Sequence, residues 1–389
     1  MQAGRSVLAQ LMDFVPKHEF DKCVLRYGGD KRVRSLSCYG QFLAMCFAQL
    51  TGRESLRDIE TCLRAVGRKL YHAGLRSPAP RSTLADANEK RDWRIFADFG
   101  QVLIAQATRL YAGEPLGVEL EGAAYALDST TVDLCLGLFP WAKYKQIRGG
   151  VKMHTLLALR GNFPRLVVIT PAHVHDVNVL ADLAFEPGAF YVMDRGYVDF
   201  AQFHRIHQTP AFFLTRAKRN LKFRRRTSAP ADKSAGIRFD QTGVLAELPS
   251  RRRYPDTLRR VGYRDPETGK PLVFLTNNSV LSAPDVAQLY RRRWQIELFF
   301  RWIKQHLRIK AFYGTSPNAV KTQIWIAICT YVLVAIVRKR LGLAGSLYTI
   351  LQILSVTLFE KTPILQAFSP TPGIHPRPDL DNQLYLQGF

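Results

Sequence analysis

The sequence favours an α/β fold with a helical region before and after it, and three observations lead to this class. Apolar residues repeat at helical spacing up to about residue 115. From about residue 120 they change to short runs rich in β-branched residues, separated by turn residues. A long amphipathic helix follows these runs. A chain of 389 residues is expected to divide into two or three domains.

Residues 1–115 are predicted to form a helical N-terminal DNA-binding domain. The segment 55–66 has a serine at the capping position and apolar residues at helical spacing. A Pro-rich turn within 76–93 leads into another helix, and a long amphipathic helix at 91–111 closes the region. A short helix, a tight turn and a helix that opens with Ser, Thr and basic neighbours are typical of a helix-turn-helix DNA reader. The same pattern also fits a plain helical bundle.

Five apolar, β-branched runs then read as strands, the first three of them antiparallel. Two short helices interrupt them, near 176–184 and at 200–208. The resulting order, β-β-β-α-β-α-β with a later long helix, matches a ribonuclease-H-like α/β fold. The predicted strands are 122–130, 150–160, 165–174, 188–197 and 210–218.

Residues 219–272 interrupt this order with a polar, Arg-rich stretch. Because turn signals alternate there with short β-prone pieces, we interpret it as a β-rich insertion rather than as disorder. A strand at 272–278 and a long helix at 284–307 complete the catalytic core, which we predict to span residues 116–310. Residues 311–389 are predicted to be mostly helical, with a Pro-rich tail, and are a candidate dimerisation region.

The charge of the chain is strongly positive. It carries 55 Lys and Arg against 32 Asp and Glu, a formal net charge of +23. Such a surplus implies an anionic partner, nucleic acid first and an anionic membrane second. The longest apolar run, 324–337, is too short to span a membrane, so we expect a buried core helix and no membrane partner. Six cysteines without a C-x-x-C pair are typical of a reduced, cytoplasmic protein.

The segment 290–304 places four functional side chains on one face if it is helical. At about 100° per residue, its tyrosine, arginine, glutamate and lysine share an arc of roughly 60°. A carboxylate flanked by phosphate-binding donors on a rigid element suits a metal-dependent reaction on nucleic acid. The alternative is a surface helix in which Arg293 and Glu297 form an ordinary i,i+4 ion pair.

Two aspartates lie where predicted strands end. Asp128 ends the first strand and Asp194 ends the fourth. These strands are neighbours in a ribonuclease-H topology, so the carboxylates would approach each other and repel unless a divalent metal were bound. Two Mg²⁺ ions (magnesium, with Mn²⁺ able to substitute) about 4 Å apart would activate the attacking oxygen and stabilise the leaving one. Glu297 would complete the set; taken singly, each aspartate also fits a turn former.

The order of these motifs resembles a known family. ALDST, then VMDRGY, then Tyr-x-x-Arg-x-x-x-Glu followed by a lysine seven residues later is similar to the DDE transposases of bacterial insertion sequences, and more narrowly to the Y-R-E-K signature group. The signature falls on Tyr290, Arg293, Glu297 and Lys304, and the likeness covers roughly residues 120–310.

The resemblance implies a cut-and-paste DNA transposase. Such an enzyme cleaves at the inverted-repeat ends of a transposon and transfers the 3′-hydroxyl into target DNA. It implies that Asp128, Asp194 and Glu297 bind the two metal ions, while Tyr290, Arg293 and Lys304 hold DNA phosphates near the transposon end. A homodimer on the paired ends, in the cytoplasm at the bacterial nucleoid, is implied as well. Some members cleave through a hairpin intermediate, for which no residue can be assigned here.

Two basic runs support a path for DNA. Residues 216–226 hold seven basic residues, and residues 251–264 hold six. Each basic residue that neutralises a phosphate releases a counterion, so binding should weaken steeply with salt. Arg216 and Lys218, at the end of a strand in the same sheet as the carboxylates, are the candidates for DNA contact near the metals. The alternative is a solvated loop without a fixed partner.

Three histidines lie on or beside predicted strands, and a structural role is the default for each. His175, next to Asp176, is the candidate to support the metal ligands, whereas His154 and His173 are expected to be structural.

Two other functions share most of these features. A structure-specific nuclease of the same fold would cut DNA without joining it. A non-catalytic repressor derived from a transposase would only bind DNA. Because all three carboxylates are in place, the sequence argues against a decayed enzyme.

Overall fold

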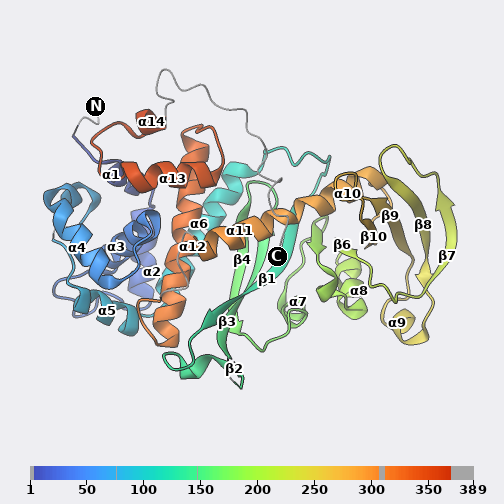
Figure 1. The fold of residues 1–389 in the computed structure, drawn as a ribbon, viewed down its shortest axis with the longest axis horizontal. Helices are drawn as coiled ribbons and strands as arrows, with labels where there is room; N and C mark the ends of the chain where they lie inside the picture. The colour runs from blue at the N-terminus through green and yellow to red at the C-terminus, as the bar shows by residue number, and fades with distance from the viewer. Residues whose placement is uncertain (1–3, 76, 147, 306–311, 369–389) are drawn as a thin grey trace.

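The computed structural model describes residues 4–75, 77–146, 148–305 and 312–368. A group of helices fills one end of an elongated molecule, and a large sheet leads from it to the other end (Figure 1). The predicted α/β class, with helices flanking a large sheet, is confirmed.

Helices occupy the chain up to the first strand. Several begin at a serine, because its hydroxyl accepts a backbone N–H that has no partner within the helix. The predicted cap is present, since the Ser55 hydroxyl accepts the N–H of Asp58 at 3.1 Å. The helices are α1 (Val7–Met12), α2 (Lys17–Arg26), α3 (Cys38–Thr51), α4 (Leu56–Val66), the 3-10 helix η1 (Gly67–Ala73), α5 (Arg81–Lys90) and α6 (Arg94–Tyr111).

The last helices of the chain pack on these first ones. They are α12 (Pro317–Arg340), α13 (Leu347–Thr357) and α14 (Ile364–Ala367), and together with α1–α6 they form what we call the helical body. The Tyr111 hydroxyl donates to the carbonyl of Ala335 at 2.9 Å, which joins α6 to α12 inside a shared core. α12 is long and apolar enough to cross a membrane, but nearly all of it is buried within the fold. The predicted division of the chain into three domains stays a prediction.

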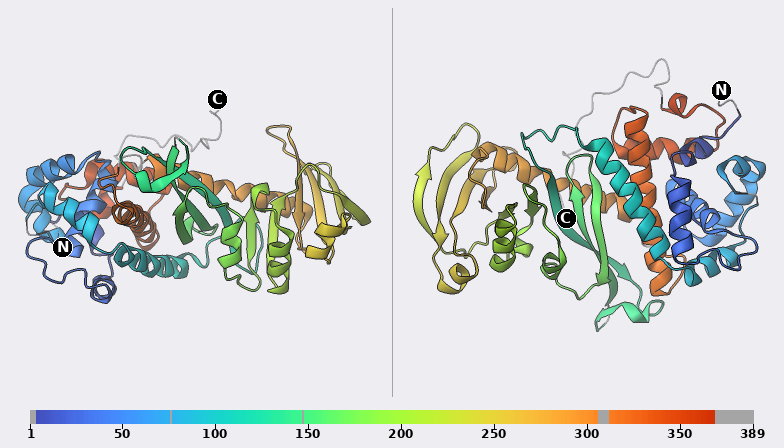
Figure 2. Two further views of the ribbon diagram at one scale, coloured as in Figure 1. Left: turned by 90° about the horizontal axis from the view of Figure 1, so that it is seen from below. Right: turned by 180° about the vertical axis from the view of Figure 1, so that it is seen from behind.

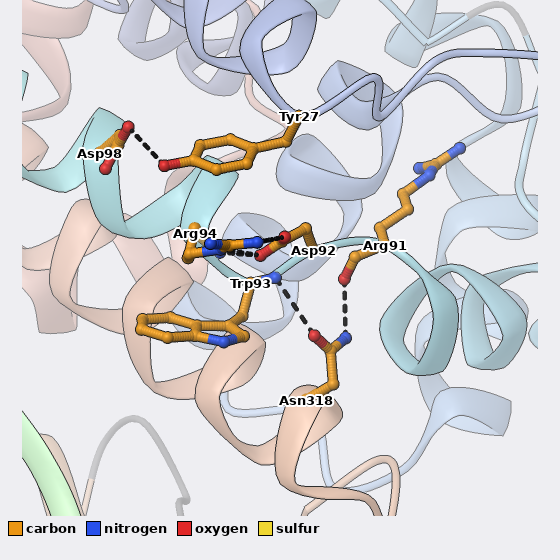
Figure 3. Close-up of polar contacts among 7 residues, drawn as sticks. All are labelled: Tyr27, Arg91, Asp92, Trp93, Arg94, Asp98 and Asn318. Carbon is orange, nitrogen blue, oxygen red and sulfur yellow. Dashed lines mark hydrogen bonds and ion pairs between the residues drawn. The ribbon is translucent and has the colours of Figure 1, made fainter.

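Asn318, at the start of α12, ties that helix to the turn between α5 and α6 (Figure 3). Its side-chain amide donates to the carbonyl of Arg91 at 2.6 Å, and its side-chain oxygen accepts the N–H of Trp93 at 3.3 Å. In the same view the Tyr27 hydroxyl donates to Asp98 at 3.0 Å, joining α2 to α6. Polar contacts therefore fix how the helices before and after the sheet meet.

Ten strands of the described chain form one mixed sheet. Its order is β2-β3-β1-β5-β6-β10-β9-β8-β7, and β4 pairs with β3 as well. The short β2 was not predicted. The strands are β1 (Ala124–Leu134), β2 (Lys143–Lys145), β3 (Arg148–Ala158), β4 (Phe163–Pro171), β5 (Phe190–Met193), β6 (Phe212–Arg216), β7 (Phe223–Ala229), β8 (Ile237–Leu245), β9 (Leu258–Arg264) and β10 (Pro271–Thr276).

The five central strands follow the predicted order of elements. β1, β3 and β4 pair antiparallel, whereas β5 runs parallel to β1 and β6 parallel to β5. The short helices α7 (Asn178–Asp182) and α8 (Phe200–Gln208) lie in the connections before and after β5. They lie on one face of the sheet, and the two helices directly after β10 lie on the other (Figure 2). The first and fourth predicted strands are therefore neighbours.

The stretch between β6 and β10 extends the same sheet. β7, β8 and β9 pair antiparallel in succession, β9 pairs with β10, and α9 (Leu248–Arg253) lies between β8 and β9. Because β10 also pairs with β6, this β-rich stretch is continuous with the central strands.

The long helix predicted over 284–307 is two helices, α10 (Ala283–Arg292) and α11 (Trp294–Gln305), and this part of the prediction was wrong. Arg293 lies between them. Its N–H bonds to the carbonyl of Tyr290, and its own carbonyl accepts the N–H of Ile296. Bonds between residues three apart tighten the turn to a 3-10 form, which ends one helix and begins the next.

Candidate active site

Asp128 and Asp194 lie side by side where the parallel pairing of β1 and β5 ends. The last parallel pair of β1 and β5 is Leu127 with Met193, and each aspartate is the next residue along the chain. Asp194 follows the end of β5, as predicted, but β1 continues along β3 to Leu134, so the prediction that Asp128 ends its strand was wrong. The carboxyl ends of neighbouring parallel strands are where α/β sheets place their functional groups.

Both aspartates also shape their local backbone. One carboxylate oxygen of Asp128 accepts the N–H of Ser129 at 2.8 Å, and one of Asp194 accepts the N–H of Arg195 at 2.6 Å. Asp194 thereby caps the 3-10 helix η3 (Arg195–Tyr197). The turn-forming role considered from the sequence is therefore present at Asp194, whereas Asp128 lies within β1, which continues to Leu134.

Arg293 bridges Asp128 to Glu297. Its guanidinium donates to Asp128 Oδ2 at 3.0 Å and to Glu297 Oε1 at 2.6 Å. The side chain is 14% exposed, and its guanidinium carbon lies 5.7 Å from the centre of the Tyr290 ring. Arg293 therefore contacts Tyr290, Glu297 and, on β1, Asp128, while the shared face of all four signature residues stays a prediction.

The site carries more negative charge than its surroundings favour. Burial is the main cause that raises the pKa of Asp128 to about 6, and the charges of Glu297 and Asp194 add to it. The Ser129 N–H and the Arg293 guanidinium act in the opposite direction. A further cation nearby would stabilise the charged form of such a carboxylate.

The donors present suit a hard divalent cation. They are carboxylate oxygens, which Mg²⁺ prefers, and the guanidinium of Arg293 lies between two of them as a stand-in for a positive ion. Within the residues that the structure describes, no three His, Cys, Asp or Glu side chains are gathered closely enough to hold a metal. Asp128, Asp194 and Glu297 therefore fit a divalent cation by the chemistry of their oxygens, but they are not gathered into a closed metal site, and Arg293 lies between Asp128 and Glu297.

The remaining predicted DNA-binding residues differ in how deeply they are buried. Tyr290 is buried, and burial raises the pKa of its hydroxyl. The charge of Asp194 adds to this rise, whereas those of Arg293 and Arg216 oppose it. Arg216 ends β6 half-buried, and Lys218 is exposed just beyond it. Lys304 lies in the last turn of α11, about two turns after Glu297, and is half-buried.

Sequence reasoning missed a polar group on the opposite face of β1. Asp176, which precedes α7, accepts a hydrogen bond from the Ser129 hydroxyl at 2.6 Å and lies 3.1 Å from Lys152 Nζ. His175, proposed from the sequence, is exposed, whereas His154 is the histidine beside Asp176. The signal available was alternation along the strand, since Ser129 pairs with His154 and so shares a face with it.

Comparison with known families gives two matches. Residues 120–333 match the family described as Transposase DDE domain. Residues 3–76 match a domain of unknown function, DUF4372.

Curated relatives are similar over much of the chain. A protein named as transposase y4zB of Sinorhizobium fredii is 34% identical over 301 residues, 76% of this chain and 82% of that protein. One named as transposase for insertion sequence element IS5377 of Geobacillus stearothermophilus is 33% identical over 53% of this chain and 54% of its own length. One named as transposase for insertion sequence element IS4SA of Synechocystis is 24% identical over 80% of this chain and 84% of its own length.

Among solved structures, the piggyBac transposase in a synaptic complex with hairpin DNA has a TM-score of 0.43 and 12% sequence identity. The alignment covers 94% of this chain and 80% of that one.

Proposed function

The chain belongs to the transposases of the DDE domain family, and from that premise we propose that Asp128, Asp194 and Glu297 are its catalytic carboxylates. It is a DNA transposase, an enzyme that cleaves DNA and transfers strands. The observation that carries the proposal is the convergence of three distant segments. Two of the carboxylates directly follow the last parallel pair of β1 and β5, and Arg293 links the third to the first.

The strand order supports a ribonuclease-H-like core. β4-β3-β1-β5-β6 places three antiparallel strands next to two parallel ones, with helices on both faces. This core, residues 116–310, would carry the chemistry. Outside it, residues 1–115 would bind DNA and residues 311–389 would contribute to a homodimer. Because α12–α14 share a core with α1–α6, a dimer contact would use their outer surfaces.

The three carboxylates would hold two divalent ions, Mg²⁺ or Mn²⁺. When bound, these ions would supply Lewis-acid activation of the attacking oxygen and charge stabilisation for the leaving one. The protein's own contribution is geometric. β1 and β5 fix two of the carboxylates, and the tight turn at Arg293 directs the third toward them from α11.

The Y-R-E-K residues have distinct parts in this proposal. Arg293 keeps Asp128 and Glu297 at a fixed separation by donating to both. The ring of Tyr290 lies beside that guanidinium, in a cation–π contact. Lys304, on the same helix, and Arg216 and Lys218, beyond β6, are the cations proposed to receive DNA phosphates next to the carboxylates.

Charge on the β-rich stretch supports a DNA path that leads to the site. Residues 216–264 hold fifteen basic residues against four acidic ones. On the edge strand β7, Arg224, Arg225 and Arg226 are exposed, and so are the three arginines that end α9. None of these six forms an ion pair within the described part of the chain, so their charge is available to phosphates. We propose that the transposon-end duplex and the target DNA run past this surface, in the cytoplasm at the nucleoid.

The experiment is a cleavage and joining assay with the purified full-length protein. The substrate is DNA carrying the inverted repeats that flank the coding region, with Mg²⁺ or Mn²⁺. Cleavage with joining supports transposition, cleavage alone indicates a nuclease, and salt-sensitive binding alone indicates a repressor. Glu297→Ala should abolish cleavage and leave end binding largely intact. A Glu297→Ala protein that cleaves as well as the wild type removes this glutamate from the mechanism.

A further inference from the structure

A polar cluster lies on the face of the sheet opposite to Asp128. We call Ser129, Lys152, His154 and Asp176 the reverse-face cluster. The Ser129 hydroxyl and the Lys152 ammonium both reach the same oxygen, Asp176 Oδ1, at 2.6 and 3.1 Å. Ser129 comes from β1, Lys152 and His154 from β3, and Asp176 from the loop after β4. One carboxylate thus gathers three segments of the chain.

The position of the cluster matters because β1 loses a neighbour there. Pairing with β5 ends at Leu127, so from Asp128 onward β1 is bonded on one edge only, to β3. A strand held on one edge is freer to twist and open than one held on both. Ser129 is the next residue after Asp128. Its hydrogen bond to Asp176 therefore holds β1 at the point where the strand loses its pairing with β5.

Asp176 is itself held firmly. Lys152 Nζ donates to the carbonyl of Val174 at 2.7 Å while it pairs with Asp176, so the loop is fastened to β3 twice. The Lys152 side chain is only 13% exposed, and a charge this buried is tolerated because it is paired and hydrogen-bonded.

His154 completes the cluster as a neutral side chain. It is fully buried, and burial lowers its pKa to about 4. Its Nε2 lies 2.9 Å from the Thr170 hydroxyl and its Nδ1 lies 3.7 Å from Asp176. A neutral imidazole does not neutralise Asp176, so Lys152 is the cation that does.

The cluster also reaches the turn after Asp194. Tyr197 follows Asp194 by three residues and is 2% exposed. Burial raises the pKa of the Tyr197 hydroxyl, and the negative charges of Asp176 and Asp128 add to that effect. The hydroxyl is therefore within electrostatic range of both carboxylates.

We propose that Asp176 is a positioning residue for Asp128, acting through Ser129 and anchored by Lys152. It fixes the one-sided segment of β1 from behind, without touching DNA or the reacting atoms. The inference rests on the proposed catalytic function of Asp128. It assigns a role in the reaction to residues outside the carboxylates and the Y-R-E-K positions.

The test uses four variants of the full-length protein. Ser129→Ala removes the hydroxyl, Ser129→Thr keeps it, and Asp176→Asn keeps an acceptor oxygen but removes the charge. Asp182→Asn is the matched control, because Asp182 is an exposed acidic residue of α7 outside the cluster. For each, three quantities are measured: the affinity for transposon-end DNA, the single-turnover cleavage rate at saturating protein, and the Mg²⁺ concentration that gives half of that rate.

Positioning predicts a loss of rate without a loss of binding. Ser129→Ala and Asp176→Asn should cleave about ten-fold or more slowly, since small misplacements of a reacting group are costly. Their affinity for end DNA should stay within about two-fold of the wild type, and they should need more Mg²⁺. Ser129→Thr should restore most of the rate, and Asp182→Asn should match the wild type.

Other outcomes overturn the inference. Wild-type rates in both Ser129→Ala and Asp176→Asn would do so. Equal losses of binding, cleavage and melting temperature, without rescue by Ser129→Thr, would do so too, because they indicate a purely structural role. A wild-type protein that binds the ends but never cleaves them would overturn the proposed function and, with it, this inference. A wild-type protein that cleaves, with variants that behave as above, would overturn this inference alone.

Discussion

The guanidinium of Arg293 donates to the carboxylate of Asp128 at 3.0 Å, although 165 residues separate them in the chain. The same guanidinium donates to Glu297 at 2.6 Å. One arginine therefore connects the middle of β1 to the start of α11. A positive group lies between two of the three carboxylates, and its removal should have consequences that can be measured without any catalytic assay.

Replacing Arg293 with glutamine should destabilise the metal-free protein. Asp128 and Glu297 would lose their shared partner while remaining partly buried. The expected loss is about 1–3 kcal/mol in the free energy of unfolding. Thermal melting in a chelator measures it, and added Mg²⁺ or Mn²⁺ should raise the melting temperature more in Arg293→Gln than in the wild type.

Arg292→Gln is the control for that experiment. Arg292 precedes Arg293 but is exposed at the end of α10. Its loss should leave both the chelator melting temperature and the response to metal unchanged. If Arg293→Gln behaves like Arg292→Gln, the bridge contributes nothing and Arg293 is not holding the carboxylates.

Local chemistry explains which parts of the site the sequence could indicate. Asp194 was predictable as a strand end because it follows a buried apolar run and precedes polar turn residues, whereas Asp128 only looked like one, since the polar residues 129–131 after it continue β1. Arg293 and Glu297 were predictable as neighbours because four residues make about one helical turn. Ser55 was predictable as a cap for the same local reason.

Contacts between distant segments left no such signal. The pairing of Arg293 with Asp128 and that of Ser129 with Asp176 both depend on where the sheet ends. The tight turn at Arg293 was missed because no glycine or proline marks a break within 285–305. The packing of α12 on α6 could not be derived either. An apolar sequence predicts that a helix is buried, but it does not identify the element on which the helix packs.

His154 should make the stability of the protein depend on pH. Burial lowers its pKa in the folded state to about 4, below the value near 6.5 of an exposed imidazole. Between these values the unfolded chain binds more protons, so the free energy of unfolding falls as the pH falls. The full stabilisation is present above about pH 6.5, and up to about 3 kcal/mol is lost on going down to about pH 4.

His154→Gln measures that contribution, because glutamine does not titrate. The stability difference between the wild type and His154→Gln should shrink as the pH is lowered from 7 to 4. The exposed His173→Gln serves as the control and should follow the wild type at every pH. A difference that stays constant with pH would mean that His154 is not buried as a neutral group.

Asn318→Ala should loosen the junction between the helices before and after the sheet. The amide donates to the carbonyl of Arg91 and accepts from Trp93 (Figure 3). It also donates to the carbonyl of Asn88. Leaving these groups without partners is expected to cost about 1–3 kcal/mol. Amide hydrogen exchange should become faster in the turn between α5 and α6, while Asn220→Ala, at an exposed position after β6, should change neither exchange nor stability.

The exposed arginines of β7 should set how strongly DNA binding depends on salt. If Arg224, Arg225 and Arg226 each neutralise a phosphate, replacing all three with glutamine removes about three counterions from the exchange. The slope of log affinity against log salt should then fall by about 2–3. Replacing the same three with lysine preserves the charge and should preserve the slope, which makes it the matched control. An unchanged slope in the glutamine variant would place the DNA away from β7. A fall in both variants would show that guanidinium geometry, and not charge, makes the contact.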